Sequence, residues 1–340
     1  MPQIHDLADA LYKLAPWEGM LEHQLIALRH PETGRLDHIS IMGQAGNHYC
    51  LALYLGPTAR HRFNLMQEAD YEGIQLSQED ALSLILDTQQ LQASFSPRAD
   101  LFKSELAEIK TLGRKYRGGN WPSFRSFKPG HSPTRTDPAE TAWLATAIEQ
   151  VLEVTPTIRP FEDDTLRHEA DQNLILTREH IAGIWTTTWT PDDDRIFTLP
   201  TPEPDAFLLE KVRRHSRAID IEIHFQLLPS AIGKSREDSI FPYLILCVEP
   251  RSHFVLGVNM LSAEDKSHDE LIASVPTEFL RICDTHSIRP ASINVASAMT
   301  AALLTPTATA LDIPYKLHPH LPALDSALHS MMGAVMGGPM

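Results

Sequence analysis

A run of basic and aromatic residues between positions 109 and 136, the basic-aromatic segment, contains the side chains best suited to binding a ligand. Its central part reads RKYRGGNWPSFRSFKPG, and its 28 positions hold seven lysines and arginines but no acidic residue. Guanidinium groups match the oxygens of phosphates and carboxylates, and aromatic faces stack on bases and other planar groups. The pattern therefore predicts an anion-binding or nucleic-acid-binding segment. The residues that we expect to contact the ligand are Arg117, Trp121, Phe124, Arg125 and Lys128.

The charge of the remaining chain allows a second interpretation of this segment. The whole protein carries a net charge of −15, so the 312 residues outside the segment carry −22. The seven cations could therefore pair with the protein's own carboxylates while the aromatic side chains enter the core. We expect a mixture of both arrangements, in which Arg117 is paired and structural whereas Arg125 and Lys128 are exposed.

Histidines and carboxylates raise the question of a metal site. His318 and His320 form an H-x-H pair among the 17 histidines of the chain. Asp220, Glu222 and His224 alternate along one face of a predicted strand. Zinc prefers three or four nitrogen or sulfur ligands in a recognisable spacing, which this sequence lacks. We therefore predict no metal and no cofactor, and the usual motifs for nucleotide, dinucleotide or zinc-hydrolase chemistry are also absent.

Composition places the chain among globular proteins that are large enough for two domains. Of its 340 residues, 43% are hydrophobic and 21% are charged, which excludes disorder, collagen and coiled coil. The net charge of −15 argues against a general binder of polyanions. The sequence has no apolar run of about 18 residues, so we expect no membrane contact. Acidic residues near the start argue against a signal peptide, and three isolated cysteines predict reduced thiols in the cytoplasm.

The first half of the chain predicts an antiparallel meander with helices. Leucines at positions 7, 11 and 14 recur at helical spacing, and Pro16 ends that helix. Asp137, Pro138 and Glu140 together form the start signal of a later helix. The expected elements are strands at 24–29, 38–42, 48–55, 173–177 and 181–189, and helices at 7–14, within 58–92, at 104–112 and from 138 onward.

Residues 190–205 predict a boundary between two domains. This stretch reads TPDDDRIFTLPTPEPD and contains four prolines and five acidic residues. Proline removes backbone donors and disfavours helix in the preceding residue, so the stretch is typical of a linker. The predicted divisions are an N-terminal α+β domain at 1–190, a linker at 191–205, a C-terminal α/β domain at 206–335 and a flexible tail at 336–340.

The second half predicts the element order β-β-β-α-β-α-β-α. Apolar and polar residues alternate from 219 to 227, which is typical of a half-buried strand. Ser267 and Glu270 form a capping box that opens a helix, and Pro306 is expected to break the helix that starts at Ser297. The other expected elements are strands at 243–248, 254–261, 292–296 and 313–317, and a last helix at 322–335.

Short motifs in the first half resemble a family of bacterial proteins of unknown function. They are a Pro-Trp-Glu turn at 16–18, a Met-Gly turn at 42–43, a strand ending Tyr-Leu-Gly at 54–56, and a segment of the type RG-x-x-WP-x-F-R-x-x-x-PG at 117–130. The similarity covers roughly residues 5–155. The second half is similar to the domain that commonly follows in this family. The resemblance implies no activity, because none is attached to either domain.

The element order of the second half also resembles the ribonuclease H-like fold. Catalytic members of that fold hold two Mg²⁺ ions with carboxylates on the first strand, the first helix, the end of the fourth strand and a late helix. The carboxylates at three of these positions are Asp220 or Glu222, Glu270 and Asp325. The fourth predicted strand ends in Asn294 and apolar residues, without a carboxylate. We therefore expect these carboxylates not to converge around an ion.

These patterns support two hypotheses of different classes. The preferred one is a non-catalytic binding or interaction protein of the cytoplasm, which uses the basic-aromatic segment to contact a polyanion or another protein. The alternative is a metal-dependent nuclease or phosphodiesterase that uses Asp220, Glu222 and Glu270. The sequence leaves open whether the protein is an enzyme.

Overall fold

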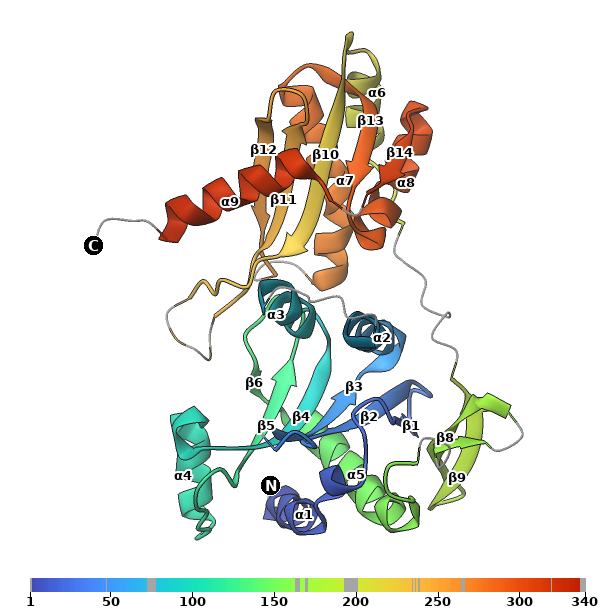
Figure 1. Ribbon diagram of the computed structural model, residues 1–340, viewed down its shortest axis with the longest axis vertical. Helices are drawn as coiled ribbons and strands as arrows, with labels where there is room; N and C mark the ends of the chain where they lie inside the picture. The colour runs from blue at the N-terminus through green and yellow to red at the C-terminus, as the bar shows by residue number, and fades with distance from the viewer. Residues whose placement is uncertain are drawn as a thin grey trace. The chain divides into compact units, whose positions relative to one another are not determined.

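A computed structural model describes the fold of most of the chain. The described residues are 2–46, 48–71, 78–162, 166–168, 171–192, 201–233, 235, 237, 239–263, 267–318 and 320–336. The chain divides into two compact units, one formed by 1–197 and 235–238 and the other by 198–234 and 239–340. Both units combine helices with a β-sheet, which confirms the predicted α+β class (Figure 1).

The first unit is built around a single large sheet. Its elements are α1 (Pro2–Leu14), the short helix η1 (Pro16–Glu18), β1 (Ile26–Arg29), β2 (Leu36–Met42), β3 (Tyr49–Tyr54), α2 (Gly56–Tyr71), α3 (Gln78–Leu86), β4 (Gln90–Ser96), η2 (Arg98–Asp100), α4 (Lys103–Thr111), β5 (Trp121–Phe127), β6 (Thr134–Arg135), α5 (Pro138–Val154), η3 (Thr155–Thr157), β7 (Arg167–His168), β8 (Asp171–Ile181) and β9 (Ile184–Pro191). Among the described residues the nine strands have the order β6-β5-β4-β3-β2-β1-β8-β7, and β9 pairs with β8. All neighbours are antiparallel except β1 and β8, which run parallel.

Different helices cover the two faces of this sheet (Figure 1). On one face, α1 and α5 share a buried apolar cluster with the strands, in which Leu11 of α1 and Ile148 of α5 are fully buried. On the other face, Phe63 of α2 belongs to a smaller cluster with Tyr54 of β3. Asp137 caps α5, as predicted, because its carboxylate accepts hydrogen bonds from the first backbone amides of the helix.

The strands β4 and β5 are corrections to the predicted elements. Gln90 and Gln92 are buried in β4, although residues 58–92 were expected to form helix. Buried polar residues conceal the apolar alternation that identifies a strand. Within β5, Pro122 is a residue that central strands exclude. It is tolerated because β6 pairs only with the later residues Arg125 and Ser126, so that β5 has one neighbour at Pro122 among the described strands.

The second unit is built around a smaller sheet. Its elements are α6 (Ala206–Arg213), β10 (Arg217–Leu227), β11 (Tyr243–Glu249), β12 (Phe254–Leu261), α7 (His268–Thr285), β13 (Ile288–Val295), α8 (Ala298–Leu311), β14 (Tyr315–Leu317) and α9 (Pro322–Met336). Among the described residues its five strands have the order β12-β11-β10-β13-β14. The first three strands are mutually antiparallel, and β13 and β14 run parallel to β10. The helix α6 precedes the predicted order β-β-β-α-β-α-β-α and was not expected.

Helices also cover both faces of the second sheet (Figure 1). α9 lies across one face, where Leu324 is buried in a cluster with Leu244 and Leu246 of β11. α7 packs on the opposite face, close to Gly257 of β12. A Cβ atom at Gly257 would lie 2.8 Å from Cγ1 of Ile282, so only glycine permits this approach between strand and helix.

The helix α8 continues through Pro306 and corrects the predicted break at that residue. A proline inside a helix costs about 3 kcal/mol because it lacks the amide donor and crowds the preceding turn. Leu303 and Leu304 before the proline and Ala308 after it are buried. Packing of this apolar face on the unit therefore outweighs the local preference.

The predicted linker at 191–205 is described only in part. β9 extends to Pro191, and the carboxylate of Asp192 is buried in the first unit, 2.9 Å from Arg60 and 2.7 Å from Arg167. The linker residues 193–200 and the predicted tail beyond residue 336 lie outside the described part of the chain. None of the described helices is long and apolar enough to cross a membrane.

Candidate functional site

The end of α4 determines how the basic-aromatic segment leaves the helix. The amide of Gly113 donates to the carbonyl of Lys110 at 3.0 Å, and the amide of Arg114 donates to the carbonyl of Ile109 at 3.1 Å. With Gly113 at a φ of 68°, these two bonds form a Schellman motif, a common way to end an α-helix. The motif turns the chain into the loop 114–120, which leads to β5.

Two contacts hold the loop 114–120 against α1. The guanidinium group of Arg114 forms ion pairs with Asp6 and Asp9, and its Nη1 lies 2.5 Å from Oδ2 of Asp9. The hydroxyl of Tyr12 donates a hydrogen bond to Oδ1 of Asn120 at 2.7 Å. Asp9 and Tyr12 are three residues apart and therefore lie on the same side of α1.

Between these contacts lies a surface groove of about 300 Å³, which we call the Arg117 groove. Its lining residues are Asp9, Tyr12, Phe95, Lys115, Tyr116, Arg117 and Asn120. Three of these side chains are aromatic, and they come from α1, from β4 and from the loop. Known ligand pockets have volumes of about 300–1,000 Å³, so the groove suits a small ligand.

The cations of the Arg117 groove have no ion-pair partner in the part of the chain that the structure describes. Lys115 and Arg117 are both exposed, and neither forms an ion pair with any residue that the structure describes. The acidic side chain in the groove, Asp9, is already paired with Arg114. The groove therefore carries positive charge in a protein whose net charge is −15. The expectation that Arg117 is paired and structural is wrong.

Each aromatic ring that lines the groove packs against another aromatic ring. The ring of Tyr12 lies 4.9 Å from that of Phe95, measured between centroids. Trp121 does not line the groove, and its ring packs against Tyr116 at a centroid distance of 5.8 Å. The guanidinium group of Arg98 lies 5.7 Å from the ring centroid of Trp121. Burial raises the pKa of Tyr116 to about 12, so its phenol is neutral at physiological pH.

Arg125 is buried and does not line the Arg117 groove. One of its terminal nitrogens lies 2.8 Å from a carboxylate oxygen of Glu105, and its guanidinium group lies 3.5 Å from the ring centroid of Phe102. The expectation that Arg125 is exposed is wrong, because α4 brings Glu105 onto this side of β5. Lys128 is exposed, as expected, but it pairs with Glu140 at 3.2 Å and is also outside the groove.

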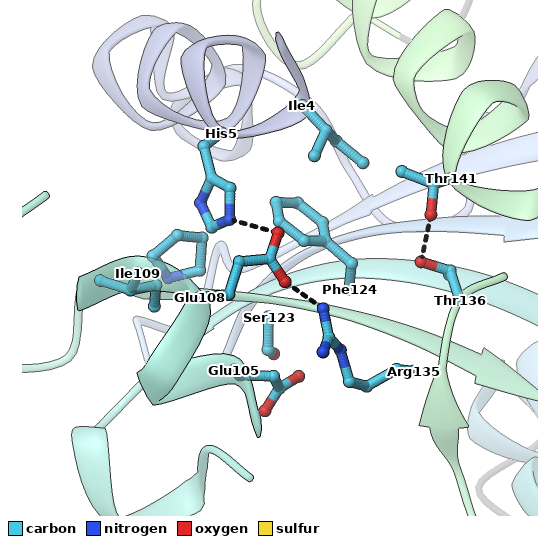
Figure 2. Close-up of a pocket in the computed structure, with 11 residues that line it drawn as sticks. Ile4, His5, Glu105, Glu108, Ile109, Ser123, Phe124, Arg135, Thr136 and Thr141 are labelled. Atoms are coloured by element: carbon cyan, nitrogen blue, oxygen red, sulfur yellow. Dashed lines mark hydrogen bonds and ion pairs between the residues drawn. The ribbon is translucent and has the colours of Figure 1, made fainter. Parts of the chain in front are cut away.

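Phe124 faces a second and much smaller cavity of about 20 Å³, shown in Figure 2. The ring of His5 on α1 meets Phe124 edge-on with a centroid distance of 5.1 Å. Nε2 of His5 lies 3.6 Å from Glu108 of α4, which also pairs with Arg135 of β6. Burial lowers the pKa of His5, which favours its neutral form. The cavity has room for about one water molecule, which is too little for a ligand. The contacts of its lining residues instead join α1, α4 and β6.

The carboxylates of the nuclease alternative are engaged in separate structural contacts. Glu222 on β10 is buried, and its carboxylate accepts a hydrogen bond at 2.9 Å from the amide of Leu324 in the first turn of α9. Asp220 accepts a hydrogen bond from the hydroxyl of Ser292 at 2.8 Å. Glu270 completes the capping box of α7, as predicted.

The remaining residues of the metal hypothesis do not gather around one point. Asn294 on β13 is the register partner of Glu222, so an amide stands beside the carboxylate of the first strand. His318 lies 3.2 Å from the amide oxygen of Asn294, and Asp325 lies in the first turn of α9. Within the described ranges, no group of three histidine, cysteine, aspartate or glutamate residues is arranged to hold a metal ion.

Comparisons with known proteins assign the chain to a family. Residues 2–178 match the family described as Domain of unknown function (DUF7309), and the chain belongs to that family because the match covers more than half of its length. Residues 208–332 match a second family, described as Domain of unknown function (DUF6930). The two matches confirm that each half is a domain of unknown function. No curated protein matches the chain, and no solved structure matches it.

Proposed function

We propose that the protein is a non-catalytic binding protein whose ligand is an anion held in the Arg117 groove. The observation that carries this proposal is the exposure of Lys115 and Arg117 next to three aromatic side chains, without an ion pair to any described residue. Cations in a concave surface focus positive potential and raise the local concentration of anions. Arginine and lysine also donate charge-assisted hydrogen bonds to phosphate and carboxylate oxygens.

The charge of the rest of the chain favours a small anion over a long one. Outside residues 109–136 the protein carries a net charge of −22, which repels a polyanion that extends beyond the groove. Within that segment, Arg114, Arg125, Lys128 and Arg135 are already paired with carboxylates of the protein. Of the seven cations this leaves Lys110, Lys115 and Arg117, and of these three only Lys115 and Arg117 line the groove.

We further propose a ribonuclease H-like fold for the second unit. The strand order β12-β11-β10-β13-β14, with β13 and β14 parallel to β10, supports this fold. The contacts of Glu222 with α9 and the amide at Asn294 support a unit without two-metal catalysis. Mg²⁺-dependent cleavage of RNA or DNA that is lost in Asp220→Ala would overturn the proposal of a non-catalytic protein and would favour the nuclease alternative.

The anion-binding proposal is tested by calorimetric titration of the full-length chain with inorganic pyrophosphate. We expect binding that weakens with rising salt and disappears in the double variant Lys115→Ala, Arg117→Ala, because the charge that attracts the anion is removed. The matched control is Lys110→Ala, since Lys110 is an exposed cation of the same segment that does not line the groove. Absence of binding, or an equal loss in the control, would contradict the proposal.

A further inference from the structure

We infer that the anion of the Arg117 groove is a single nucleotide, that is, a phosphate joined through a sugar to a flat heterocyclic base. The inference rests on the proposed function, because it names the ligand class of the same groove. It is carried by the combination, in one groove of about 300 Å³, of aromatic rings, two cations without an ion pair to any described residue, and the side-chain amide of Asn120. Each of these features matches a different part of a nucleotide.

The aromatic side chains of the groove match the base. Tyr12 is in contact with Phe95, and Tyr116 is in contact with Trp121, so the rings that line the groove are held by other rings. Stacking on such a ring stabilises a base but contributes nothing to the binding of an aliphatic or inorganic anion. Phe95 is buried in the core of the first unit, so the rings available to a base are those of Tyr12 and Tyr116, which are partly exposed.

The exposed cations match the phosphate. Lys115 and Arg117 are two positions apart on one loop, and the two glycines Gly118 and Gly119 follow at once. A Cβ atom added at either glycine would meet no other atom within 4 Å, so there is open space beside the backbone here. Amides of such an exposed glycine turn approach phosphate oxygens without steric hindrance. Asp9 does not oppose the anion strongly, because Arg114 neutralises it.

The amide of Asn120 matches the polar edge of a base or sugar. Its Oδ1 atom accepts the hydrogen bond from Tyr12, so its nitrogen retains two donors. The side chain is exposed at the groove, where these donors face no described acceptor of the protein. Ring nitrogens, exocyclic oxygens and sugar hydroxyls are the acceptors that a nucleotide offers to such a group.

The volume of the groove and the net charge of the chain together limit the ligand to one nucleotide. A groove of about 300 Å³ is at the lower limit of ligand pockets, and it accommodates one nucleotide rather than several. The strongly acidic remainder of the chain would repel the phosphates of a longer strand. We therefore assign the groove to a mononucleotide and not to a single-stranded nucleic acid.

The test compares AMP with ribose 5-phosphate, which carries the same phosphate and sugar without the base. Calorimetric titration of the full-length protein should show AMP binding about tenfold or more tightly than ribose 5-phosphate, the contribution expected of one stacked base. Tyr116→Leu should abolish this preference without changing the affinity for ribose 5-phosphate, whereas Tyr116→Phe should keep it. Trp189→Leu is the control, because Trp189 is a partly exposed aromatic residue of β9 outside the groove.

The outcomes separate this inference from the proposed function. Equal affinities for AMP and ribose 5-phosphate would overturn the nucleotide assignment and leave the anion site intact, since both ligands contain phosphate. If neither ligand nor pyrophosphate binds, the proposed function itself fails. A single-stranded oligothymidylate that binds more than about tenfold more tightly than AMP would overturn the assignment to one nucleotide. The comparison of the two ligands on the unaltered chain remains decisive even if Tyr116→Leu does not fold.

Discussion

Two arginines of the basic-aromatic segment, eight positions apart, have opposite surroundings. Arg125 lies within β5, beneath the aromatic ring of Phe102 and beside the carboxylate of Glu105. Arg117 precedes a glycine turn in the loop 114–120, where its side chain is exposed. Burial raises the pKa of Glu105 and the charge of Arg125 opposes that rise, so the two groups depend on each other.

At the scale of the residue, Arg125→Ala is expected to destabilise the protein strongly. The variant leaves the carboxylate of Glu105 buried without its cation, which costs about 2–5 kcal/mol of the free energy of unfolding. Arg117→Ala removes an exposed side chain and should change that free energy by no more than about 0.5 kcal/mol. Urea denaturation followed by circular dichroism measures both values.

A second substitution tests why Arg125→Ala loses stability. Glu105→Gln in the Arg125→Ala background removes the unpaired charge and should restore part of the lost stability. If Arg117→Ala were as destabilising as Arg125→Ala, the contrast between a buried pair and an exposed cation would be refuted.

Among the elements, α9 depends on a contact outside its own sequence. The carboxylate of Glu222 on β10 accepts a hydrogen bond from the backbone amide of Leu324 in the first turn of α9. The amides in the first turn of a helix have no carbonyl partner within the helix and need an acceptor from elsewhere. A negative charge at this end of a helix also interacts favourably with the helix dipole. The contact joins the first strand of the second unit to its last helix, next to the apolar cluster that contains Leu244 and Leu321.

Glu222→Ala is therefore expected to loosen α9. The variant leaves a buried amide without its acceptor, and we expect a loss of about 1–3 kcal/mol together with faster hydrogen exchange in the first turn of α9. Asp220→Ala serves as the matched control, because Asp220 is on the same strand but is only half-buried. Unchanged exchange in α9 on loss of Glu222 would show that its carboxylate has no anchoring role.

For the whole molecule, the division into two compact units suggests that each folds on its own. Each unit has its own sheet and its own buried apolar clusters, and each half matches a separate family. We expect limited proteolysis to cut within 193–205 and to release two fragments that each unfold cooperatively on heating. Unfolding of either fragment after cleavage, detected by calorimetry, would show that the units depend on one another.

Local sequence signals predicted many elements because the forces that form them act within a few residues. The capping boxes at Asp137 and Ser267 and the alternation from 219 to 227 correspond to α5, α7 and β10. Such signals depend on backbone amides and side chains that are neighbours in the chain. They fail where distant packing outweighs them, as at Pro306 inside α8 and Pro122 inside β5.

The candidate site was only partly accessible from the sequence. The basic and aromatic residues identified the segment around Arg117 in the sequence. The net charge of the remaining chain indicated that some of these cations could pair with the protein's own carboxylates. The groove itself also requires Tyr12 of α1 and Phe95 of β4, which are far from Arg117 in sequence and carry no signal of this role. Which cation is paired and which is exposed was decided by the tertiary structure alone, because an ion pair depends on the group that lies opposite in space. Composition counts charges, whereas the fold places Glu105 beside Arg125 and leaves Arg117 without such a partner among the described residues.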